Sequence, residues 1–385
     1  LKRLARVDCM DDWTGAVESN VVEVAVYDAF DPGEIQTDGE TICYDGDPME
    51  IGSSADAGGG DGLITYSWEF SADDFTTPGS EIVDATSPNY DPPAGLTVTT
   101  SFRRYAKDES CNTSFVASAG TWKVTVQEKP EADAGDDATV VEGETHTLAS
   151  GDAEHFTTVN WSSDGDGNFN DVDVLNPEYT PGSGDIANGE VELCMEALPV
   201  SPCLLGDTDC MTLTILRHPE VQIVSPADGE HNYTYPVTIS GTASDADGDL
   251  SKIMVRTNNG QWEDATGTGN WNTELHLLFG NFVLEAKAVD SEGLESEIKQ
   301  VTFFNGVHQV PLYDGWSMIS SFLDPQNHDL ETLMAGPVGQ NLVVVMINNQ
   351  GNIFWPSQNL NLIGDWTTAA AYKVLMNGET SLILG

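Results

Sequence analysis

The sequence predicts an all-β protein of tandem β-sandwich domains arranged as beads on a string, with a small β-rich module at the C-terminal end. Three observations predict this class. Short runs of alternating apolar residues recur along the chain, as at 63–68, 122–126 and 282–289. Clusters of Gly, Asp, Asn and Pro separate these runs at intervals of about ten residues, which is typical of sandwiches. A short helix is expected only at 328–335.

Internal repetition sets the domain boundaries. LKRLARVDC at 1–9 resembles FRRYAKDESC at 102–111, and VVEVAV at 21–26 resembles TWKVTV at 121–126. We therefore expect 1–30 to be the C-terminal strands of a truncated domain, and the chain to be a segment of a longer protein. Charged or Pro-containing linkers divide the remainder into four domains, at 31–128, 129–217, 218–305 and 306–385.

The charge of the chain excludes several partners. Its 385 residues include 63 acidic and 14 basic side chains, which gives a formal net charge of −49. A surface this negative repels phosphate backbones and anionic lipids, so we expect no nucleic-acid binding. The longest apolar run, at 342–347, is too short for membrane insertion.

Four stretches resemble known extracellular modules. Residues 42–113, with ICYDGDPMEIGSS and SFRRYAKDESC, resemble the Ig-like, PKD-like repeats of large surface adhesins exported by the type IX secretion system. Residues 131–193 resemble a second PKD-like repeat, and 223–297, with TASDADGDLSKI, resemble a bacterial Ig-like domain. Residues 315–385 are similar to a small module often found before the sorting domain of such proteins. The resemblance implies tandem Ig-like and PKD-like sandwiches in a secreted, surface-attached protein.

Six cysteines without a CxxC pair favour disulfides over a zinc site or a thioredoxin-like motif. Cys43 and Cys111 are the two cysteines of the 31–128 domain, so we expect a bridge between them. Such a bridge implies an oxidising compartment, in agreement with secretion. Cys9 corresponds to Cys111 in the repeat and is expected to be free in this chain.

A second bridge is predicted from strand alternation. Apolar residues alternate through 191–197 and 211–215, which leaves Cys194 and Cys210 on the outward faces of successive strands. If these strands form a hairpin, the two sulfurs meet across it. Reduced thiols are the alternative, and Cys203 has no expected partner in either case.

Acidic clusters offer candidate calcium ligands. Asp245, Asp247 and Asp249 alternate in one loop of the 218–305 domain, and Asp290 lies in a second loop. Two such loops can converge at one end of an Ig-like sandwich, where their hard oxygen atoms suit Ca²⁺. The alternative is that Asp and Gly serve here only as turn formers.

Tryptophans beside turns offer a candidate glycan site. Trp355 and Trp366 lie in GNIFWPSQ and GDWTTAAAY, and an exposed pair would stack on sugar rings. Packing within a core or a turn is the alternative. Trp68 and Trp161 lie inside strands and are expected in cores.

No catalytic constellation stands out, so we expect no enzymatic activity. Seven histidines are scattered, and HExxH, GxSxG and a Gly-rich phosphate loop are absent from the sequence. We interpret the chain as a stalk-like, self-assembling segment of a long secreted bacterial adhesin or filament protein, with neighbouring copies or other surface proteins as partners. The alternative is a non-catalytic, carbohydrate-binding or spacer region of a secreted polysaccharide-degrading enzyme.

Overall fold

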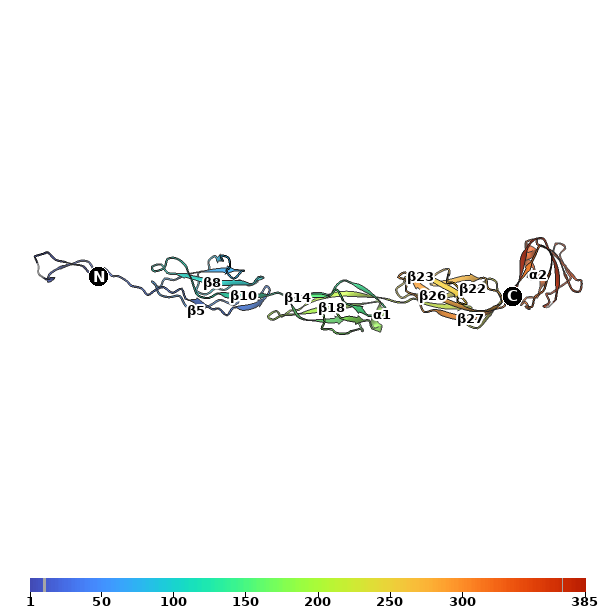
Figure 1. Cartoon of the computed structure of the whole chain (residues 1–385), viewed down its shortest axis with the longest axis horizontal. Coiled ribbons are helices and arrows are strands. Elements are labelled where there is room, and N and C mark those ends of the chain that lie inside the picture. The colour runs from blue at the N-terminus through green and yellow to red at the C-terminus, as the bar shows by residue number, and fades with distance from the viewer. Residues whose placement is uncertain (10–11, 369) are drawn as a thin grey trace. The chain divides into compact units, whose positions relative to one another are not determined.

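The computed structural model describes residues 1–9, 12–368 and 370–385, and its regular structure consists mainly of strands (Figure 1). This confirms the predicted all-β, multidomain class. The chain divides into two compact units. Unit 1 comprises Leu1–Ala138, Thr145–Gly182 and Val191–Leu213, and unit 2 comprises Thr139–Glu144, Ser183–Glu190 and Thr214–Gly385. None of the helices in the described part of the chain has the length and apolar character needed to span a bilayer.

The first thirty residues contain a small exposed hairpin. β1 (Leu4–Ala5) pairs antiparallel with β2 (Val17–Glu18). The repeat predicts a further strand at 21–26, but the structure forms none there. The backbone pairing of this hairpin continues to Leu1 and Val22, which exchange hydrogen bonds of 2.7 and 2.8 Å. A strand requires a neighbour for its backbone N–H and C=O groups, and Leu1 is the first residue of the opposite strand.

The sandwich at 31–128 buries Trp68, Phe102, Trp122 and Val124 between its sheets. Alternation along each strand sends these residues to one face. The main sheet has the order β4-β10-β8-β6-β7, with β9 paired to β8, and a second sheet joins β3 to β5. The strands are β3 (Glu34–Ile35), β4 (Glu40–Cys43), β5 (Ser53–Ala55), β6 (Thr65–Ser71), β7 (Ser80–Ile82), β8 (Thr100–Lys107), β9 (Val116–Ala117) and β10 (Trp122–Gln127).

Arg104, from the repeated FRRYAK motif, is a buried hydrogen-bonding centre of this sandwich. Its guanidinium donates to Ser118 Oγ at 3.0 Å and to the Pro88 carbonyl at 2.9 Å, and it lies 5.1 Å from the Tyr66 ring. Burial lowers the pKa of Arg104. Because an unpaired buried cation is costly, these acceptors stabilise it and tie β8 to the surrounding loops.

The following segment has a sheet in which β18 lies between β15 and β19, a second sheet of order β13-β17-β16, and a β11–β14 pair. Trp161 is buried in this segment, as its strand position predicts. The elements are β11 (Glu131–Asp133), β12 (Ala138–Val141), β13 (His146–Thr147), β14 (Asp152–Glu154), β15 (Phe156–Ser163), β16 (Asn168–Phe169), β17 (Glu178–Thr180), α1 (Ser183–Asn188), β18 (Glu190–Pro199) and β19 (Asp207–Leu216).

The next sandwich packs a sheet of order β20-β22-β25 against one of order β21-β27-β26-β23-β24. Its core contains Val221, Ile239, Trp271, Leu284 and Phe303. The strands are β20 (Glu220–Ser225), β21 (Glu230–Asn232), β22 (Val237–Ser244), β23 (Leu250–Thr257), β24 (Glu263–Asp264), β25 (Asn270–Leu275), β26 (Gly280–Asp290) and β27 (Lys299–Asn305).

The C-terminal module combines a five-stranded sheet, in the order β29-β33-β30-β31-β32, with a β28–β34 pair. Its helical part differs from the single helix predicted at 328–335. Asp329 caps one short helix by accepting from Thr332 N at 3.0 Å, and a second helix follows. The elements are β28 (His308–Leu312), β29 (Gly315–Ile319), α2 (Leu330–Leu333), α3 (Ala335–Gly339), β30 (Val343–Asn348), β31 (Ile353–Trp355), a 3₁₀ turn (Pro356–Gln358), β32 (Leu360–Asn361), β33 (Tyr372–Met376) and β34 (Thr380–Leu384).

Trp366 lies in the core of this module, where it is 2% exposed and stacks on Tyr372 with ring centroids 4.6 Å apart. The expectation that Trp366 forms half of an exposed sugar-stacking pair is therefore wrong. Thr367, which follows Trp366, donates its backbone N–H to the Tyr372 hydroxyl at 2.7 Å, so this turn is tied to the core and did not signal exposure.

Candidate functional site

A disulfide between Cys43 and Cys203 crosses the linker that follows β10. Cys43 ends β4, and Cys203 lies in the turn after β18. The Cα atoms are 4.8 Å apart, although 160 residues separate the two cysteines. Cys203 is 5% exposed, and its sulfur lies 3.6 Å from the carbonyl oxygen of Gln127. The bridge therefore joins successive β-domains within unit 1.

This pairing replaces the predicted Cys43–Cys111 bridge, which is wrong. β4 runs parallel to β10, and Cys43 lies opposite Gln127 at the end of that strand. β8 runs antiparallel to β10 and carries the chain to Cys111 at the other end of the sheet. Cys111 is exposed and free, and Cys203 has the partner that the sequence did not reveal.

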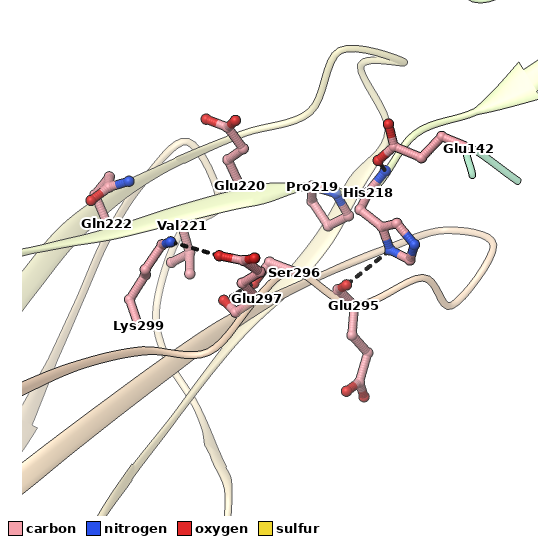
Figure 2. A pocket seen from close by; sticks show the side chains of 10 residues that line it. All are labelled: Glu142, His218, Pro219, Glu220, Val221, Gln222, Glu295, Ser296, Glu297 and Lys299. Atoms are coloured by element: carbon pink, nitrogen blue, oxygen red, sulfur yellow. Dashed lines mark hydrogen bonds and ion pairs between the residues drawn. The ribbon is translucent and has the colours of Figure 1, made fainter. Parts of the chain in front are cut away.

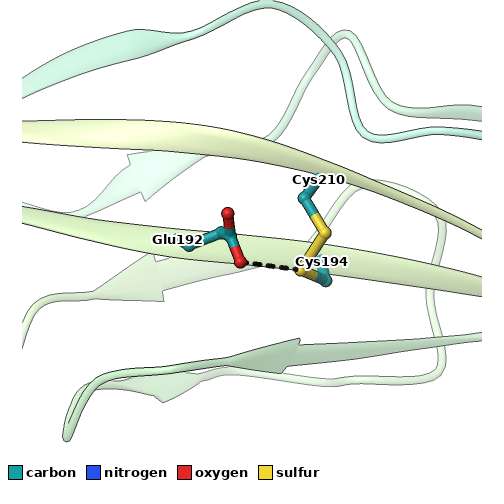
Figure 3. Close-up of side chains that lie close together, drawn as sticks. All are labelled: Glu192, Cys194 and Cys210. Atoms are coloured by element: carbon teal, nitrogen blue, oxygen red, sulfur yellow. Dashed lines mark hydrogen bonds between the residues drawn. A yellow bond between two sulfur atoms is a disulfide. The ribbon is translucent and has the colours of Figure 1, made fainter.

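The predicted Cys194–Cys210 disulfide is present and links β18 to β19. Glu192 Oε1 lies 3.8 Å from the Cys194 sulfur (Figure 3). Although Glu192, Cys194 and Cys210 form a close group, both sulfurs are in the disulfide and cannot act as thiolate ligands. The group is a structural crosslink on the outward face of the hairpin.

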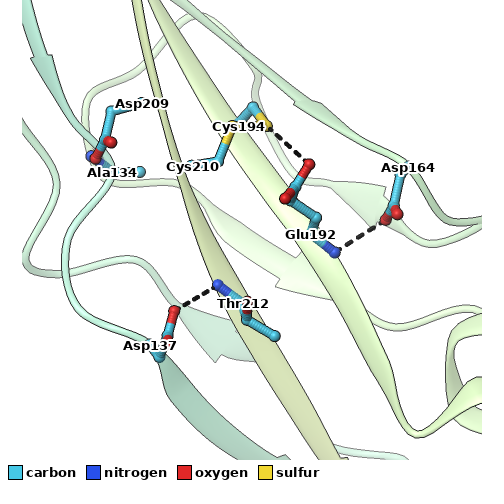
Figure 4. The surroundings of a disulfide bond; sticks show 8 residues. All are labelled: Ala134, Asp137, Asp164, Glu192, Cys194, Asp209, Cys210 and Thr212. Carbon is cyan, nitrogen blue, oxygen red and sulfur yellow. Dashed lines mark hydrogen bonds between the residues drawn. A yellow bond between two sulfur atoms is a disulfide. The ribbon is translucent and has the colours of Figure 1, made fainter.

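Carboxylates around this crosslink hold backbone N–H groups (Figure 4). Asp137 accepts from Thr212 N at 2.7 Å, and Asp164 accepts from Glu192 N at 2.9 Å. Asp209 accepts from Ala134 N at 2.8 Å. Many acidic side chains of this region thus have a structural role rather than forming an open ligand site.

Two acidic loops converge at one end of the sandwich formed by β20–β27. Asp245 follows β22, Asp249 precedes β23, and Asp290 ends β26. Leu250 pairs with Asp290 across β23 and β26, so Asp249 and Asp290 come together at the edge of this strand pair. One carboxylate oxygen from each of Asp245, Asp249 and Asp290 lies within 4.8 Å of the other two. The structure thus brings together three of the four predicted calcium ligands.

The three carboxylates are unequally satisfied. Asp290 is 4% exposed and accepts from Leu294 N at 2.7 Å. Oδ2 of Asp245 and Oδ1 of Asp249 are shielded from solvent and have no hydrogen-bond partner. Burial raises the pKa of Asp245, and the charges of Asp249 and Asp247 raise it further. Hydrogen bonds with Glu292 and Ser291 lower the pKa of Asp249.

Asp247, the fourth predicted ligand, points to a different partner. Its carboxylate accepts from both the backbone N and the Nε of Arg217 at 2.7 Å. Arg217 also donates to the Ala187 carbonyl at 3.0 Å. The middle of the acidic loop therefore holds the linker residue that precedes β20.

A shallow pocket adjoins this linker within unit 2 (Figure 2). His218 donates its backbone N–H to Glu142 Oε1 at 2.9 Å, and its Nδ1 lies 3.0 Å from the Glu295 carbonyl. Lys299 pairs with Glu297 at 3.0 Å. These contacts anchor the linker at His218. The residues that line the pocket do not place a nucleophile beside a general base.

The outward face of the C-terminal sheet carries a row of apolar side chains, and Lys373 lies in the next row, opposite Met318. Trp316 and Met318 are 58% and 71% exposed on β29, and Trp355 is 40% exposed on β31. Trp316 lies opposite Leu375, which lies opposite Val345. The Met346–Phe354 pairing places Trp355 next to Val345 in the same row. Sequence reasoning missed Trp316, although the alternation in GWSMI was the available signal.

Comparisons with known proteins agree with this architecture. Residues 219–278 match a family described as a bacterial Ig domain, and 31–128 match a domain of unknown function (DUF8696). No curated protein matches the chain.

Similar solved structures include a mutated three-domain Ig fragment of titin, with 10% identity, 73% and 97% coverage of this chain and that one, and a TM-score of 0.41. Three human CDH23 extracellular domains show 15% identity, 71% and 99% coverage, and a TM-score of 0.39. Sidekick-1 immunoglobulin domains 1–4 show 12% identity, 93% and 98% coverage, and a TM-score of 0.30. The bacterial Ig-domain match at 219–278 and the disulfides together are typical of an extracellular or surface protein with a structural or spacer region.

Proposed function

We propose that this chain is a load-bearing stalk segment of a large secreted bacterial surface protein, of the adhesin or filament type. The observation that carries the proposal is the Cys43–Cys203 disulfide. It crosses the linker between consecutive domains and closes a loop of 160 residues, so tension on the chain need not extend the enclosed polypeptide. The acidic surface supports a secreted role, because its charge opposes association through exposed strand edges.

The disulfide changes the covalent path that tension follows. A pulling force that reaches Cys43 passes through the sulfur atoms to Cys203 and bypasses the polypeptide between them. The bypassed segment includes Trp68 and Trp122, which lie in the core of the first sandwich. Most of the polypeptide of both domains is thus bypassed, although Ile42 before Cys43 and β19 after Cys203 stay in the load path. A stalk under flow gains from such a bypass, because the enclosed segment cannot be extended while the bridge is intact.

Single-molecule pulling between the chain termini tests this proposal. Reduction should lengthen the fully extended chain by roughly 550 Å, since each freed residue adds up to about 3.4 Å. A Cys43→Ser/Cys203→Ser variant should already show all but about 50 Å of this extension without reductant, because its Cys194–Cys210 bridge still bypasses 16 residues. Equal extension of the oxidised wild type and this variant would contradict a load-bearing bridge. Loss of surface display height on deletion of 31–217 from the complete protein would extend the result to cells.

A second candidate function, glycan binding by an accessory region of a polysaccharide-degrading enzyme, is favoured by the apolar sheet face. Neighbouring strands lie about 4.8 Å apart, so Trp316 and Trp355, three strands apart, are separated by about 14 Å. Leu375 and Val345 form the floor between them. Flat aromatic surfaces at this separation suit stacking on a sugar chain.

Binding to insoluble polysaccharides tests this second candidate. Trp316→Ala and Trp355→Ala should each weaken retention at least tenfold, because each removes one stacking surface. Trp13→Ala is a matched control, since Trp13 is 56% exposed but belongs to the N-terminal hairpin. Equal retention of all three variants, or no retention of the wild type, would contradict glycan binding through this face.

A further inference from the structure

We propose that Asp245, Asp249 and Asp290 form a calcium site that orders the loops at one end of the β20–β27 sandwich. The inference does not depend on the proposed stalk function. It concerns a cation held by three carboxylates within one domain, and it can be tested without pulling or adhesion measurements.

The first support is the arrangement of the ligand atoms. One oxygen from each carboxylate lies within 4.8 Å of the other two. Calcium binds oxygen ligands at about 2.3–2.6 Å, so side-chain adjustments of a few tenths of an ångström let a single ion contact all three atoms. Asp290 is fixed by its pairing with Leu250 across β23 and β26, Asp249 directly precedes Leu250, and Asp245 begins the loop that follows β22.

The second support is that two buried carboxylate oxygen atoms lack hydrogen-bond partners. Oδ2 of Asp245 and Oδ1 of Asp249 are inaccessible to solvent and accept no hydrogen bond. Asp290 is 4% exposed, and among the described residues none of these three carboxylates forms an ion pair with a basic side chain. Burying carboxylates without partners is costly, and a divalent cation removes that cost.

The chemistry of the donors selects calcium among common metals. All three ligand groups are carboxylates, without the nitrogen or sulfur atoms that zinc and copper favour. Ser291 and Glu292 lie beside Asp249, where their oxygen atoms allow the higher coordination number of calcium. Magnesium requires a stricter octahedral geometry, so we expect it to bind more weakly.

The site also affects the linker. Asp247 lies between Asp245 and Asp249, and its carboxylate holds Arg217 through two contacts of 2.7 Å. Asp247 N–H donates to Asp245 Oδ1 at 2.7 Å. A cation that fixes Asp245 and Asp249 therefore fixes the loop segment that binds Arg217. We expect calcium to protect the bond after Arg217 from trypsin.

Calorimetric titration of the full chain with CaCl₂ in physiological salt tests the site. Asp245→Asn and Asp249→Asn should each lower the affinity at least tenfold, and Asp290→Asn should do the same while keeping an oxygen acceptor for Leu294 N. Asp264→Asn is the matched control, because Asp264 is an exposed carboxylate on β24 of the same sandwich. It should bind calcium as the wild type does.

Two further measurements separate specific binding from attraction to an acidic surface. Calcium should raise the thermal transition of the wild type and of Asp264→Asn, but not that of Asp249→Asn. Calcium should slow trypsin cleavage after Arg217 at least fivefold in the wild type. It should not slow this cleavage in the three variants of the ligand residues. Equal calcium affinity of all variants, or a wild-type transition that does not change between EGTA and millimolar calcium, would overturn the proposal. Failure of any variant to fold would leave the wild-type EGTA comparison as the deciding result.

Discussion

The linkers at 127–131 and 217–219 are held by different chemistry. The first, within unit 1, lies beside a covalent bridge between Cys43 and Cys203. The second, within unit 2, is held by the Arg217–Asp247 ion pair, whose side chains are 17% and 21% exposed. The first joint should respond to reductants and be indifferent to salt or calcium, whereas the second should respond to ions and be indifferent to reductants.

The comparison shows that one chain can combine a permanent joint with an adjustable one. A disulfide persists in an oxidising environment whatever the ionic conditions. An ion pair beside a group of unsatisfied carboxylates depends on the cations that are available. The proposed calcium site would thus let one joint respond to its surroundings while the disulfide keeps the other joint fixed.

The largest expected effect is loss of the first joint. A Cys43→Ala/Cys203→Ala variant should lower the free energy of unfolding of unit 1 by about 5 kcal/mol, because the bridge closes a loop of 160 residues. Urea denaturation followed by tryptophan fluorescence measures the change. The matched variant Cys194→Ala/Cys210→Ala opens a loop of only 16 residues and should cost about 3 kcal/mol. A smaller loss for the first variant than for the second would contradict the long-range role of Cys203.

A smaller effect is expected at the second joint. Asp247→Asn should lower the stability of the β20–β27 sandwich by about 1–2 kcal/mol, since charge-assisted hydrogen bonds to a partly buried Arg217 are lost. Thermal unfolding at low and high salt measures it. Glu297→Gln is the control, because the Lys299–Glu297 pair is 41% and 88% exposed and should contribute less than about 0.5 kcal/mol. Equal effects of the two variants would show that Arg217 contributes no more than a surface charge.

Local patterns predicted what lies within one strand or loop pair. Strand alternation predicted the Cys194–Cys210 bridge, since both residues are on one hairpin. Loop convergence in a sandwich placed Asp245 near Asp249 and Asp290, but it did not show that Asp247 would turn to Arg217. Asp247 binds Arg217 because the linker brings Arg217 to the acidic loop. The path of a linker has no periodic sequence pattern from which it could be predicted.

Patterns failed where the answer depends on contacts distant in sequence. Counting cysteines within one domain missed Cys203, because the partner of Cys43 lies in the next domain. Trp366 and Trp355 both neighbour turns, yet Trp366 is buried against Tyr372 and Trp355 is exposed. Whether a tryptophan beside a turn is exposed depends on which face of the sheet it joins. The local sequence around the turn does not show which face that is.

The smallest expected effect is a pH response confined to the second joint. Burial raises the pKa of Asp245, so its ionisation opposes folding. That penalty is present above the folded-state pKa and disappears as pH falls through it. In calcium-depleted buffer, Asp245→Asn should therefore melt higher than the wild type at pH 7.5, and the gap should close as the pH approaches 4.

A second carboxyl group in the same sandwich has a pKa shift of the opposite direction and contributes equally to both proteins. Hydrogen bonds from Thr302 lower the pKa of Asp228 below its usual 3.8, so its stabilisation is present above that value and lost as pH falls through the lowered pKa. Both proteins retain Asp228, so its contribution cancels in the difference between their melting temperatures. A gap that stays constant from pH 7.5 to 4 would show that Asp245 carries no burial penalty. In that case ionisation of Asp245 would give the second joint no pH response.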